Sequence, residues 1–488
     1  MKTLIEHAMI VTMNDSREVI KQGYLLVEQD RIKEIGAGMY QGNRDGVEIV
    51  NGDNNIIIPG LINAHTHSYA NLVKGTTENI PLELWMLYIM AEGKNMTKED
   101  YAINAALGSI EMLKSGTTTF LDHLAQDTDG MKTVAAEYKK AGIRAVLTPM
   151  FGDRAYADSL PEALQIELGK EPHGPKAVGS GWQDNIAMVE SVIQNVSEPD
   201  KGITVAVGPS GPQRCSDELL VASMELAQKY ELPWHTHLLE TKAQEVTGYE
   251  RYGHSMVEHL EKLGILNESV SFAHGVWVSD TDIELIAKRG STIVHNPTSN
   301  LLLGSGVLPL IPLKEAGVHI GIGTDGANCC GYQSMFESMK LAAILSNTFT
   351  PDYKRWVKAV DVLEMATIGS ARAVGMSDEI GSLEAGKKAD FVLLNKEVSN
   401  FAPLNDLIWQ LVYGRADMAI DAVYVNGKKV VSERKAVGVD EKAIFNKAIE
   451  NGADLLQRNQ TEFEKIKNKA PDIYHMLMKV AEIPTKQA

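Results

Sequence analysis

The stretch Pro59-Gly60-Leu61-Ile62-Asn63-Ala64-His65-Thr66-His67 joins an apolar run, which begins at Ile56, to two histidines one residue apart. Such a run is typical of a buried strand, and the side chains of a strand alternate between its two faces. His65 and His67 therefore share one face, so both imidazoles can reach one metal ion. The pair alone leaves a second interpretation open, in which both histidines are ordinary hydrogen-bonded polar residues.

Seven further apolar segments follow, and helical stretches separate them. Predicted helices at Asp100–Ser115 and Met131–Ala141 have apolar residues at spacings of three and four, and a glycine follows each as a C-terminal stop. Eight strand–helix units in about 310 residues predict an α/β fold, a (β/α)8 TIM barrel whose chemistry lies at the C-terminal strand ends. The predicted strands are Ile57–His67, Thr117–Asp122, Ile143–Met150, Ile203–Pro209, Leu232–Leu238, Val270–His274, Ser291–His295 and Val318–Asp325.

The two ends of the chain differ from this middle. Residues 1–57 and 378–440 have the pattern of short strands and turns, which predicts an accessory β domain beside a barrel at 58–377. Residues 441–488 predict a charged, amphipathic helical extension. The length of 488 residues suits one large domain with a smaller one.

Composition narrows the choice of partners and compartment. The net charge of −17, without a basic tract, argues against nucleic acid. No apolar stretch approaches the roughly 18 residues of a membrane span, and Met1–His7 lacks the apolar segment of a secretory signal. The three cysteines, Cys215, Cys329 and Cys330, cannot build a disulfide framework. We therefore expect a cytoplasmic protein that contacts neither membrane nor nucleic acid.

Polar residues return at the ends of three later predicted strands. They are His235-Thr236-His237-Leu238-Leu239-Glu240, then His274, then Gly323-Thr324-Asp325-Gly326. Three neutral imidazoles and one carboxylate suit zinc or ferrous iron and leave a position free for water. His235 and His237 lie on the same face of their strand, so alternation does not choose between them.

In order and spacing, these motifs resemble the amidohydrolase superfamily. The resemblance is closest to its branch of nucleobase, adenosine-type and triazine deaminases and hydrolases, which includes atrazine chlorohydrolase and the methylthioadenosine deaminases. It covers nearly the whole chain up to residue 435. The motifs that carry it are Pro59–His67, His237-x-x-Glu240, His274, His295-Asn296-Pro297-x-Ser299-Asn300 and Gly323-Thr324-Asp325-Gly326.

The resemblance implies a set of roles. His65, His67, His237 and Asp325 would bind one divalent metal ion, with zinc expected and iron as the alternative. Glu240 and His274 would be acid/base or substrate-facing groups. The resemblance also implies that both chain ends join in a small β-sandwich, and that the protein is a homodimer.

A single metal ion is expected because the fourth predicted strand has no lysine at its end. Family members with two metals use a carboxylated lysine at the end of that strand. In this chain the one lysine near Ile203–Pro209 is Lys201, which precedes the strand. The segment after Asp325, residues 327–333, also departs from the Ser-Asn-Asn pattern common in the deaminase branch.

The expected chemistry is hydrolytic. A bound divalent ion lowers the pKa of its water from about 16 toward about 7. Asp325 would accept a proton from that water, and His274 would stabilise the developing oxyanion. Glu240 would protonate a ring nitrogen and then the leaving amine. Its alternative interpretation is a solvated carboxylate at a strand end.

Four residues are candidates for substrate binding, each with a structural alternative. Trp85 follows the first predicted strand and suits an aromatic lid, although its helical spacing also suits the core. Gln213, after strand four, could contact the edge of a ring. His295 and Asn300 follow strand seven, where turn-forming residues are equally expected.

The sequence thus predicts a mononuclear, metal-dependent amidohydrolase that deaminates a small nitrogen heterocycle of the purine, pterin, pyrimidine or s-triazine type. One alternative is hydrolysis of a urea or carbamate C–N bond. Another is hydrolytic displacement on an s-triazine ring, by dechlorination or N-dealkylation. A third is a metal-binding relative without catalysis, because fold alone does not decide function.

Overall fold

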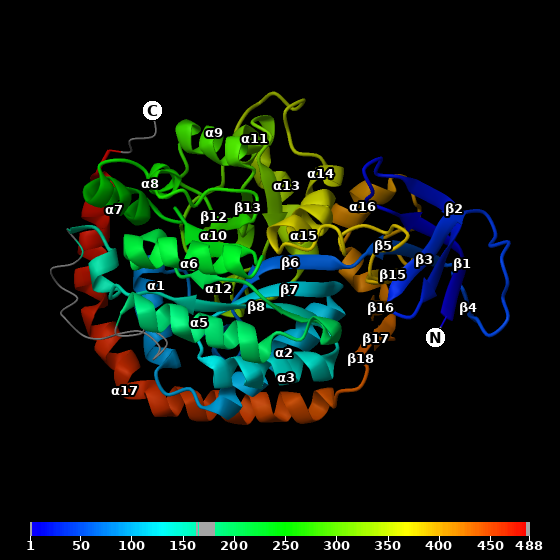
Figure 1. Cartoon of the computed structure of the whole chain (residues 1–488), viewed down its shortest axis with the longest axis horizontal. Helices are drawn as coiled ribbons and strands as arrows, with labels where there is room; N and C mark the ends of the chain where they lie inside the picture. The colour runs from blue at the N-terminus through cyan, green and yellow to red at the C-terminus, as the bar shows by residue number, and fades with distance from the viewer. Residues whose placement is uncertain (1, 163, 165–180, 485–488) are drawn as a thin grey trace.

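The computed structural model describes residues 2–162, 164 and 181–484, which form a barrel of parallel strands with a second sheet at one side (Figure 1). The barrel strands are β6 (Leu61–Thr66), β7 (Thr117–Leu124), β8 (Arg144–Phe151), β9 (Ile203–Val205), β10 (Gly208–Pro209), β11 (Trp234–Leu238), β12 (Val270–His274), β13 (Thr292–His295) and β14 (His319–Ile322). They form two parallel ladders, β6-β7-β8 with β9 and β10 paired to β8, and β11-β12-β13-β14. A bridge between Val207 and Trp234 joins the ladders on one side. On the other, the Asp325 N–H donates to the His65 carbonyl oxygen at 2.9 Å.

Each of the eight predicted segments contains a strand, although several ends are shifted; β14 ends at Ile322, before the predicted Asp325. Two segments are also divided. The fourth is interrupted between β9 and β10. The first is divided at Gly60: β5 (Asn55–Pro59) belongs to the second sheet, and β6 to the barrel. A side chain at Gly60 does not fit, because its Cβ would lie 2.1 Å from Thr118 Oγ1. The chain therefore crosses between the two sheets at a residue that only glycine can occupy without displacing Thr118.

Helices follow the barrel strands, and their ends carry the expected signals. The predicted helix at Asp100–Ser115 begins earlier, as α2 (Lys98–Lys114), because Thr97 and Asp100 form a capping box. The second, α3 (Thr128–Ala141), ends at Gly142, whose φ of 77° is left-handed. The other helices around the barrel are α1 (Leu82–Gly93), α5 (Trp182–Val196), α6 (Asp217–Lys229), α7 (Lys242–Tyr252), α8 (Met256–Lys262), α9 (Asp280–Arg289), α10 (Pro297–Leu302), α11 (Leu310–Glu315), α12 (Ala327–Cys330), α13 (Met335–Ser346), α14 (Ala359–Glu364) and α15 (Ser370–Ala373).

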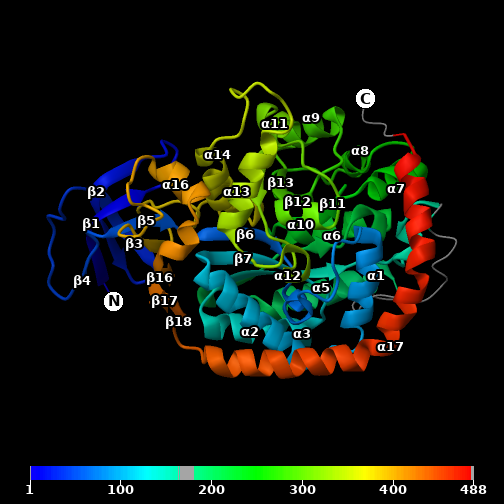
Figure 2. The same ribbon diagram turned by 180° about the vertical axis from the view of Figure 1, so that it is seen from behind.

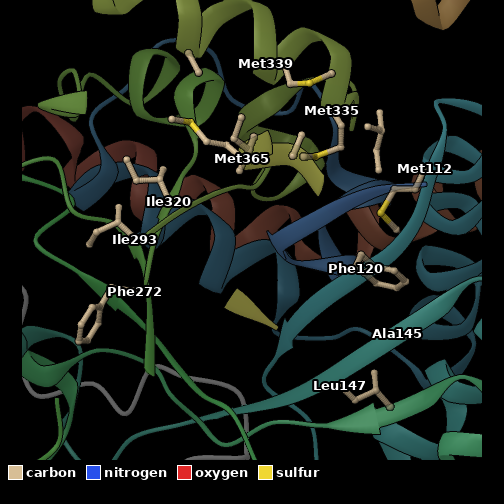
Figure 3. Packing of buried hydrophobic residues seen from close by; sticks show 14 of the residues in the cluster. Met112, Phe120, Ala145, Leu147, Phe272, Ile293, Ile320, Met335, Met339 and Met365 are labelled. Atoms are coloured by element: carbon tan, nitrogen blue, oxygen red, sulfur yellow. The ribbon is translucent and has the colours of Figure 1, made fainter. Parts of the chain in front are cut away.

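The hydrophobic core has an outer and an inner part. On the outside of the strands, Phe120, Ile293 and Ile320 share one cluster with Met112 of α2 and Met335 of α13 (Figure 3). The alternate residues of the same strands form a separate inner cluster, which fills the barrel. This inner cluster includes Ile62, Ala64, Leu121, Val146, Ala206 and Val294. Because apolar side chains fill the interior, polar chemistry is confined to the C-terminal end of the barrel.

The two ends of the chain join in one nine-stranded sheet. Its strands are β1 (Lys2–Val11), β2 (Val19–Glu28), β3 (Arg31–Ala37), β4 (Glu48–Asn51), β5, β15 (Phe391–Asn395), β16 (Ile420–Val425), β17 (Lys428–Ser432) and β18 (Lys435–Ala436). The order is β18-β17-β16-β15-β5-β1-β2-β3, with β4 beside β1, so β5 and β15 bring the ends together. A short helix, α16 (Leu407–Tyr413), lies between β15 and β16. The two-layer sandwich and the domain limits at 57 and 378 stay predictions.

A long helix, α17 (Glu441–Glu482), occupies the predicted helical extension. It contacts α2 and then turns along α1 and α7 on the outside of the barrel (Figures 1 and 2). Residues 485–488 lie outside the described part of the chain. Among the described helices, none is both long and apolar enough to cross a membrane.

A buried ion pair connects the barrel to the nine-stranded sheet. Arg144, at the start of β8, pairs with Asp390, which directly precedes β15, and its Nη1 also donates to Thr119 Oγ1 at 3.0 Å. Arg144 is 2% exposed and Asp390 is 5% exposed. The backbone N–H of Asn426 donates to Asp390 Oδ1 at 2.7 Å. The carboxylate is therefore shared between the two sheets.

Replacing Asp390 with alanine should be strongly destabilising, because it leaves a buried guanidinium without its partner. We expect the free energy of unfolding, measured by urea denaturation followed by circular dichroism, to fall by about 3–5 kcal/mol. Arg355→Ala is the control, since it removes an exposed pair with Glu315 and should cost about 1 kcal/mol or less. A loss for Asp390→Ala no larger than for this control would show that the junction does not depend on the pair.

Candidate metal centre and active site

Four predicted ligands converge at the C-terminal end of the barrel. His65 and His67 come from the end of β6, His237 from β11, and Asp325 from the segment after β14. Asp325 Oδ1 lies 3.4 Å from His67 Nε2 and 3.7 Å from His65 Nε2, and His237 Nε2 lies 3.3 Å from His67 Nε2. Ligand atoms about 2.0–2.2 Å from a tetrahedral zinc ion lie roughly 3.3–3.6 Å from one another. These three distances fit ligands of one ion, and His65, His67 and Asp325 form one group whose ligand atoms all lie within 4.8 Å of one another.

Hydrogen bonds behind two of the imidazoles fix which nitrogen faces the centre. His67 Nδ1 donates to the His123 carbonyl oxygen, and His237 Nδ1 donates to the Ser210 carbonyl oxygen, both at 2.5 Å. A carbonyl oxygen only accepts, so Nδ1 carries the proton and the Nε2 lone pair points at the centre. Such outer hydrogen bonds are typical of metal-binding histidines.

The third imidazole is held by another histidine. His65 Nδ1 lies 2.9 Å from His235 Nε2, and His235 Nδ1 lies 2.8 Å from Ser271 Oγ. His65 Nε2 is buried and has no hydrogen-bond partner among the described residues. An unpartnered buried nitrogen is costly, and a metal ion at the centre would satisfy it. The residues present therefore fit a metal ion, and His235 lies one layer behind the ligand positions.

Burial and the neighbouring side chains favour the neutral form of two of these imidazoles and the charged form of the carboxylate. Burial, followed by the neighbouring imidazoles, lowers the pKa of His65 well below its usual value and that of His237 to about 3. Burial alone would raise the pKa of Asp325, but His67, His274 and His237 together lower it. At neutral pH His65 and His237 thus offer neutral nitrogen ligands and Asp325 an ionised oxygen ligand, as a divalent ion requires.

Two further polar side chains stand beside this cluster. His274 Nε2 lies 3.7 Å from Glu240 Oε2 and 3.9 Å from Asp325 Oδ2, and its Nδ1 donates to Asn300 Oδ1 at 2.8 Å. Burial first, and then the charges of Asp325 and Glu83, raise the pKa of Glu240 well above its usual value. Glu240 is therefore a carboxylic acid where Asp325 is a carboxylate, and pairs with pKa values pushed apart are typical of acid/base sites.

The backbone at three of these strand ends is strained. Leu239, His274 and Asp325 have φ values of 44°, 76° and 67°, in the left-handed region that non-glycine residues rarely adopt. Such conformations persist where the surrounding structure imposes them, and they cluster at functional sites.

A cavity of ≈ 90 Å³ opens onto this cluster of histidines and carboxyl groups. Of the four residues predicted to contact substrate, two line the cavity and two do not. Trp85 and Gln213 line it, and the Trp85 Nε1 and Gln213 Oε1 atoms have no hydrogen-bond partner among the described residues. His295 and Asn300 are buried behind the lining, where Asn300 orients His274. Contact of the latter two with substrate stays a prediction.

Sequence reasoning missed several residues of the site. Tyr69 and Arg214 line the cavity, and His123 lies beside the His67 and His237 imidazoles. Two of them had a signal in the sequence: Tyr69 follows His67 by two positions, and Arg214 follows Gln213. His123 lies at the end of the second strand, where the alternation of β7 directs it into the barrel.

With this geometry in place, the chain can be assigned to a family: it belongs to the amidohydrolase family, which matches residues 56–430. The 5′-deoxyadenosine deaminase of Methanosarcina barkeri is 31% identical over 458 residues, covering 93% of this chain and 98% of that protein. The 5-methylthioadenosine/S-adenosylhomocysteine deaminase of Thermodesulfovibrio yellowstonii is 33% identical over 457 residues, covering 92% and 98%.

Solved structures have the same fold. An adenosine deaminase from Xanthomonas campestris with bound zinc superimposes with a TM-score of 0.81 at 28% identity, covering 94% of this chain and 98% of that one. The atrazine chlorohydrolase of Arthrobacter aurescens TC1, complexed with zinc, gives a TM-score of 0.83 at 23% identity, covering 93% and 100%. The family's TIM-barrel fold, expected from the sequence, is confirmed.

The two neighbouring histidines of β11 should differ in their effect on metal content. His237→Ala removes an atom that faces the centre, so we expect a protein that loses metal and activity together. His235→Ala leaves the ligand atoms in place but frees His65 to rotate, which should weaken metal binding by about 10- to 100-fold. Elemental analysis after dialysis against a graded series of chelator concentrations checks both, with about one ion per chain expected in the wild type. If the two variants retained metal equally, the assignment of His237 as the ligand would be wrong. Two tightly bound ions per chain in active enzyme would contradict a single metal site.

Proposed function

We propose that this protein is a metal-dependent aminohydrolase that removes the exocyclic amine from a small nitrogen heterocycle. The observation that carries the proposal is that the carboxyl groups of Glu240 and Asp325 lie 3.7 and 3.9 Å from His274 Nε2. Burial raises the pKa of Glu240, which favours its protonated form, whereas the imidazoles around Asp325 lower its pKa and favour its ionised form. Deamination of a ring needs both: an acceptor for the proton of water and a donor for the ring nitrogen. The deaminase names of relatives that share about a third of the sequence support the same reaction.

His65, His67, His237 and Asp325 would hold one divalent ion, with zinc expected and iron as the alternative. The support is the matched spacing of their atoms, the unpartnered His65 Nε2 and the zinc bound by the Xanthomonas campestris relative. When bound, the ion supplies Lewis acidity, which lets water ionise near neutral pH.

The two carboxyl groups divide the proton transfers between them. Asp325 is held ionised, so it can accept a proton from the attacking water. Glu240 is held neutral and can protonate the ring nitrogen next to the carbon under attack, which makes that carbon more electrophilic. The same carboxyl group can then take up the proton that Asp325 accepted and pass it to the departing amine. The remaining hydroxyl proton restores Glu240 as the product carbonyl forms. Each group begins in the protonation state that its role requires.

The remaining residues position the reacting groups. Asn300 accepts from His274 Nδ1 and so fixes the ring with its Nε2 lone pair toward Asp325 and Glu240. Once Nε2 has taken up a proton from one of these groups, it can donate to an oxygen that gains charge. Trp85 Nε1 and Gln213 Oε1 offer one donor and one acceptor to the edge of a ring. A ligand that pairs both would relieve two unsatisfied atoms of the cavity.

The family resemblance also supports proposals about context. We expect a homodimer in the cytoplasm, with a β domain formed by residues 1–57 and 378–440 beside a barrel at 58–377. Light scattering coupled to gel filtration measures the first of these, and limited proteolysis with mass spectrometry maps the domain limits.

Ammonia release from a substrate panel tests the function directly. The metal-loaded protein should release ammonia from at least one purine, pterin, pyrimidine or s-triazine amine, with adenosine-type nucleosides first because of the relatives. The panel should include a chloro-s-triazine, an alkylamino-s-triazine, a urea and a carbamate. Chloride, alkylamine or carbonate release without ammonia from any ring would replace deamination with one of the alternative hydrolyses. A metal-loaded protein inert on the whole panel would favour a non-catalytic role.

Glu240→Gln should separate chemistry from metal binding. The amide keeps the size of the side chain and the oxygen that accepts from Ser305, but it cannot cycle a proton. We expect a folded protein with wild-type metal content and a kcat lower by about 10²- to 10⁴-fold. The loss should be smaller on a chloro-s-triazine, whose leaving group needs no proton.

Glu92→Gln is the matched control for this variant. Glu92 is also a buried carboxyl group, and burial raises its pKa to about 7, but it does not line the cavity. Steady-state kinetics on the same amine should show a kcat within about threefold of wild type for Glu92→Gln, since no proton transfer is assigned to it. Near wild-type turnover by Glu240→Gln would remove this residue from the proton transfers.

A further inference from the structure

The cavity contains a cation without a counter-ion. Arg214 closes a short turn, Pro212–Arg214, directly after β10, and its side chain lines the same cavity as Glu240 and Asp325. Its Nε is buried and has no hydrogen-bond partner, and the guanidinium forms no ion pair with any carboxylate of the described residues. Asp325 and Glu240, in contrast, are surrounded by histidines and a serine. The acidic groups of the cavity therefore do not neutralise Arg214.

A guanidinium whose Nε is buried without a hydrogen-bond partner destabilises the folded chain. Arginine stays protonated in proteins, so it cannot escape the cost of burial by losing its charge. In the described part of the chain, its compensating contact is the ring of Tyr156, whose centroid lies 5.5 Å from the guanidinium carbon. A cation–π contact leaves the N–H donors free. A ligand that supplies oxygen acceptors would therefore gain the charge-assisted hydrogen bonds that the folded chain does not provide.

The turn that carries Arg214 is held in place from two directions. The Arg214 carbonyl oxygen accepts from the N–H groups of Asp153 and Arg154, at 3.2 and 3.0 Å, in the loop after β8. Arg251 of α7 donates to the Gln213 carbonyl oxygen at 2.7 Å. Tyr156, which lies under the guanidinium, donates its hydroxyl to the Glu83 carbonyl oxygen of α1 at 3.1 Å. The cation is thus preorganised, which is the condition for specific binding at low entropic cost.

We propose that Arg214 binds a carboxylate that the substrate carries on the part remote from the reacting ring. The inference rests on the proposed function and narrows its substrate class to heterocyclic amines with an anionic substituent. The planar guanidinium donates two parallel N–H bonds to a carboxylate, a geometry that a neutral amide or hydroxyl group matches less well. A phosphate group shares this chemistry and is the second source that the experiment must separate.

Two nucleosides that differ only in charge test the proposal. Adenosine 5′-carboxylate and adenosine 5′-carboxamide have nearly the same shape, so their ratio of kcat/KM isolates the anionic group. The metal-loaded full chain should prefer the carboxylate by at least about tenfold, through KM, because a charge-assisted hydrogen bond is roughly twice as strong as a neutral one. Arg214→Met should lower that ratio at least about tenfold, and Arg214→Lys, which keeps the charge without the planar fork, should fall between.

Arg154→Met is the matched control. Arg154 is a half-buried arginine in the adjacent loop, its side chain donates to the Tyr252 hydroxyl at 3.4 Å, and it does not line the cavity. This variant should keep the wild-type carboxylate preference. Thermal unfolding of all three variants checks that each is folded. A ratio unchanged by Arg214→Met, or lowered equally by Arg154→Met, would overturn the proposal.

Titration calorimetry separates this proposal from the function on which it rests. The 5′-carboxylate should bind metal-loaded wild type more tightly than the carboxamide by about tenfold, and Arg214→Met should remove that difference. If neither nucleoside releases ammonia, the deaminase proposal fails for adenosine-type rings, whereas the calorimetric difference still decides the role of Arg214. Adenosine 5′-monophosphate is the third ligand, and tenfold tighter binding of it would replace the carboxylate with a phosphate.

Discussion

The hydrogen bond from the Asp325 N–H to the His65 carbonyl oxygen is the contact on which the rest of the site depends. It closes the barrel between its last and first strands, and the two residues that make it also carry two of the four proposed ligands. The hydrogen bond that closes the barrel therefore also fixes the backbone positions of two proposed metal ligands. Gly323 adjoins this point, where a Cβ would lie 2.8 Å from the His65 carbonyl oxygen, so the two strands approach as closely as backbone allows.

Burial at the end of the closed barrel then shifts the pKa values of the two carboxyl groups of the site. The same apolar surroundings act on every group, yet they give Glu240 a raised pKa and leave Asp325 with a lowered one. The difference comes from position: three imidazoles surround Asp325, whereas Glu240 has one histidine and a serine hydroxyl. An acid and a base are thus obtained from two carboxyl groups a few ångströms apart, without a strongly basic side chain.

Periodic patterns in the sequence predicted the eight strands and the shared face of His65 and His67, because such patterns need only local chain geometry. The set of four ligands came from the resemblance to the family. The sequence could not divide Ile57–His67 at Gly60, because that break depends on Thr118 of a neighbouring strand. It could not choose between His235 and His237, which share a face; the pairing of His235 with His65 is a contact between strands. Arg214 was missed for the same reason, since a cation without a partner is recognised only when its surroundings are known.

The wall of the cavity that α1 forms is packed in turn against α17, near the end of the chain. Trp85 of α1 lines the cavity, while Leu84 and Leu87 of the same helix pack against Ile473 and Met476 of α17. A cavity of ≈ 90 Å³ is smaller than the roughly 300–1,000 Å³ of typical ligand pockets, so side chains of the lining must shift to admit a larger ligand, and those of α1 are among them. Since α1 is packed between the cavity and α17, any such movement must also shift or loosen its contacts with α17. The free energy needed to admit a substrate is therefore set partly by a helix that contributes no residue to the cavity lining.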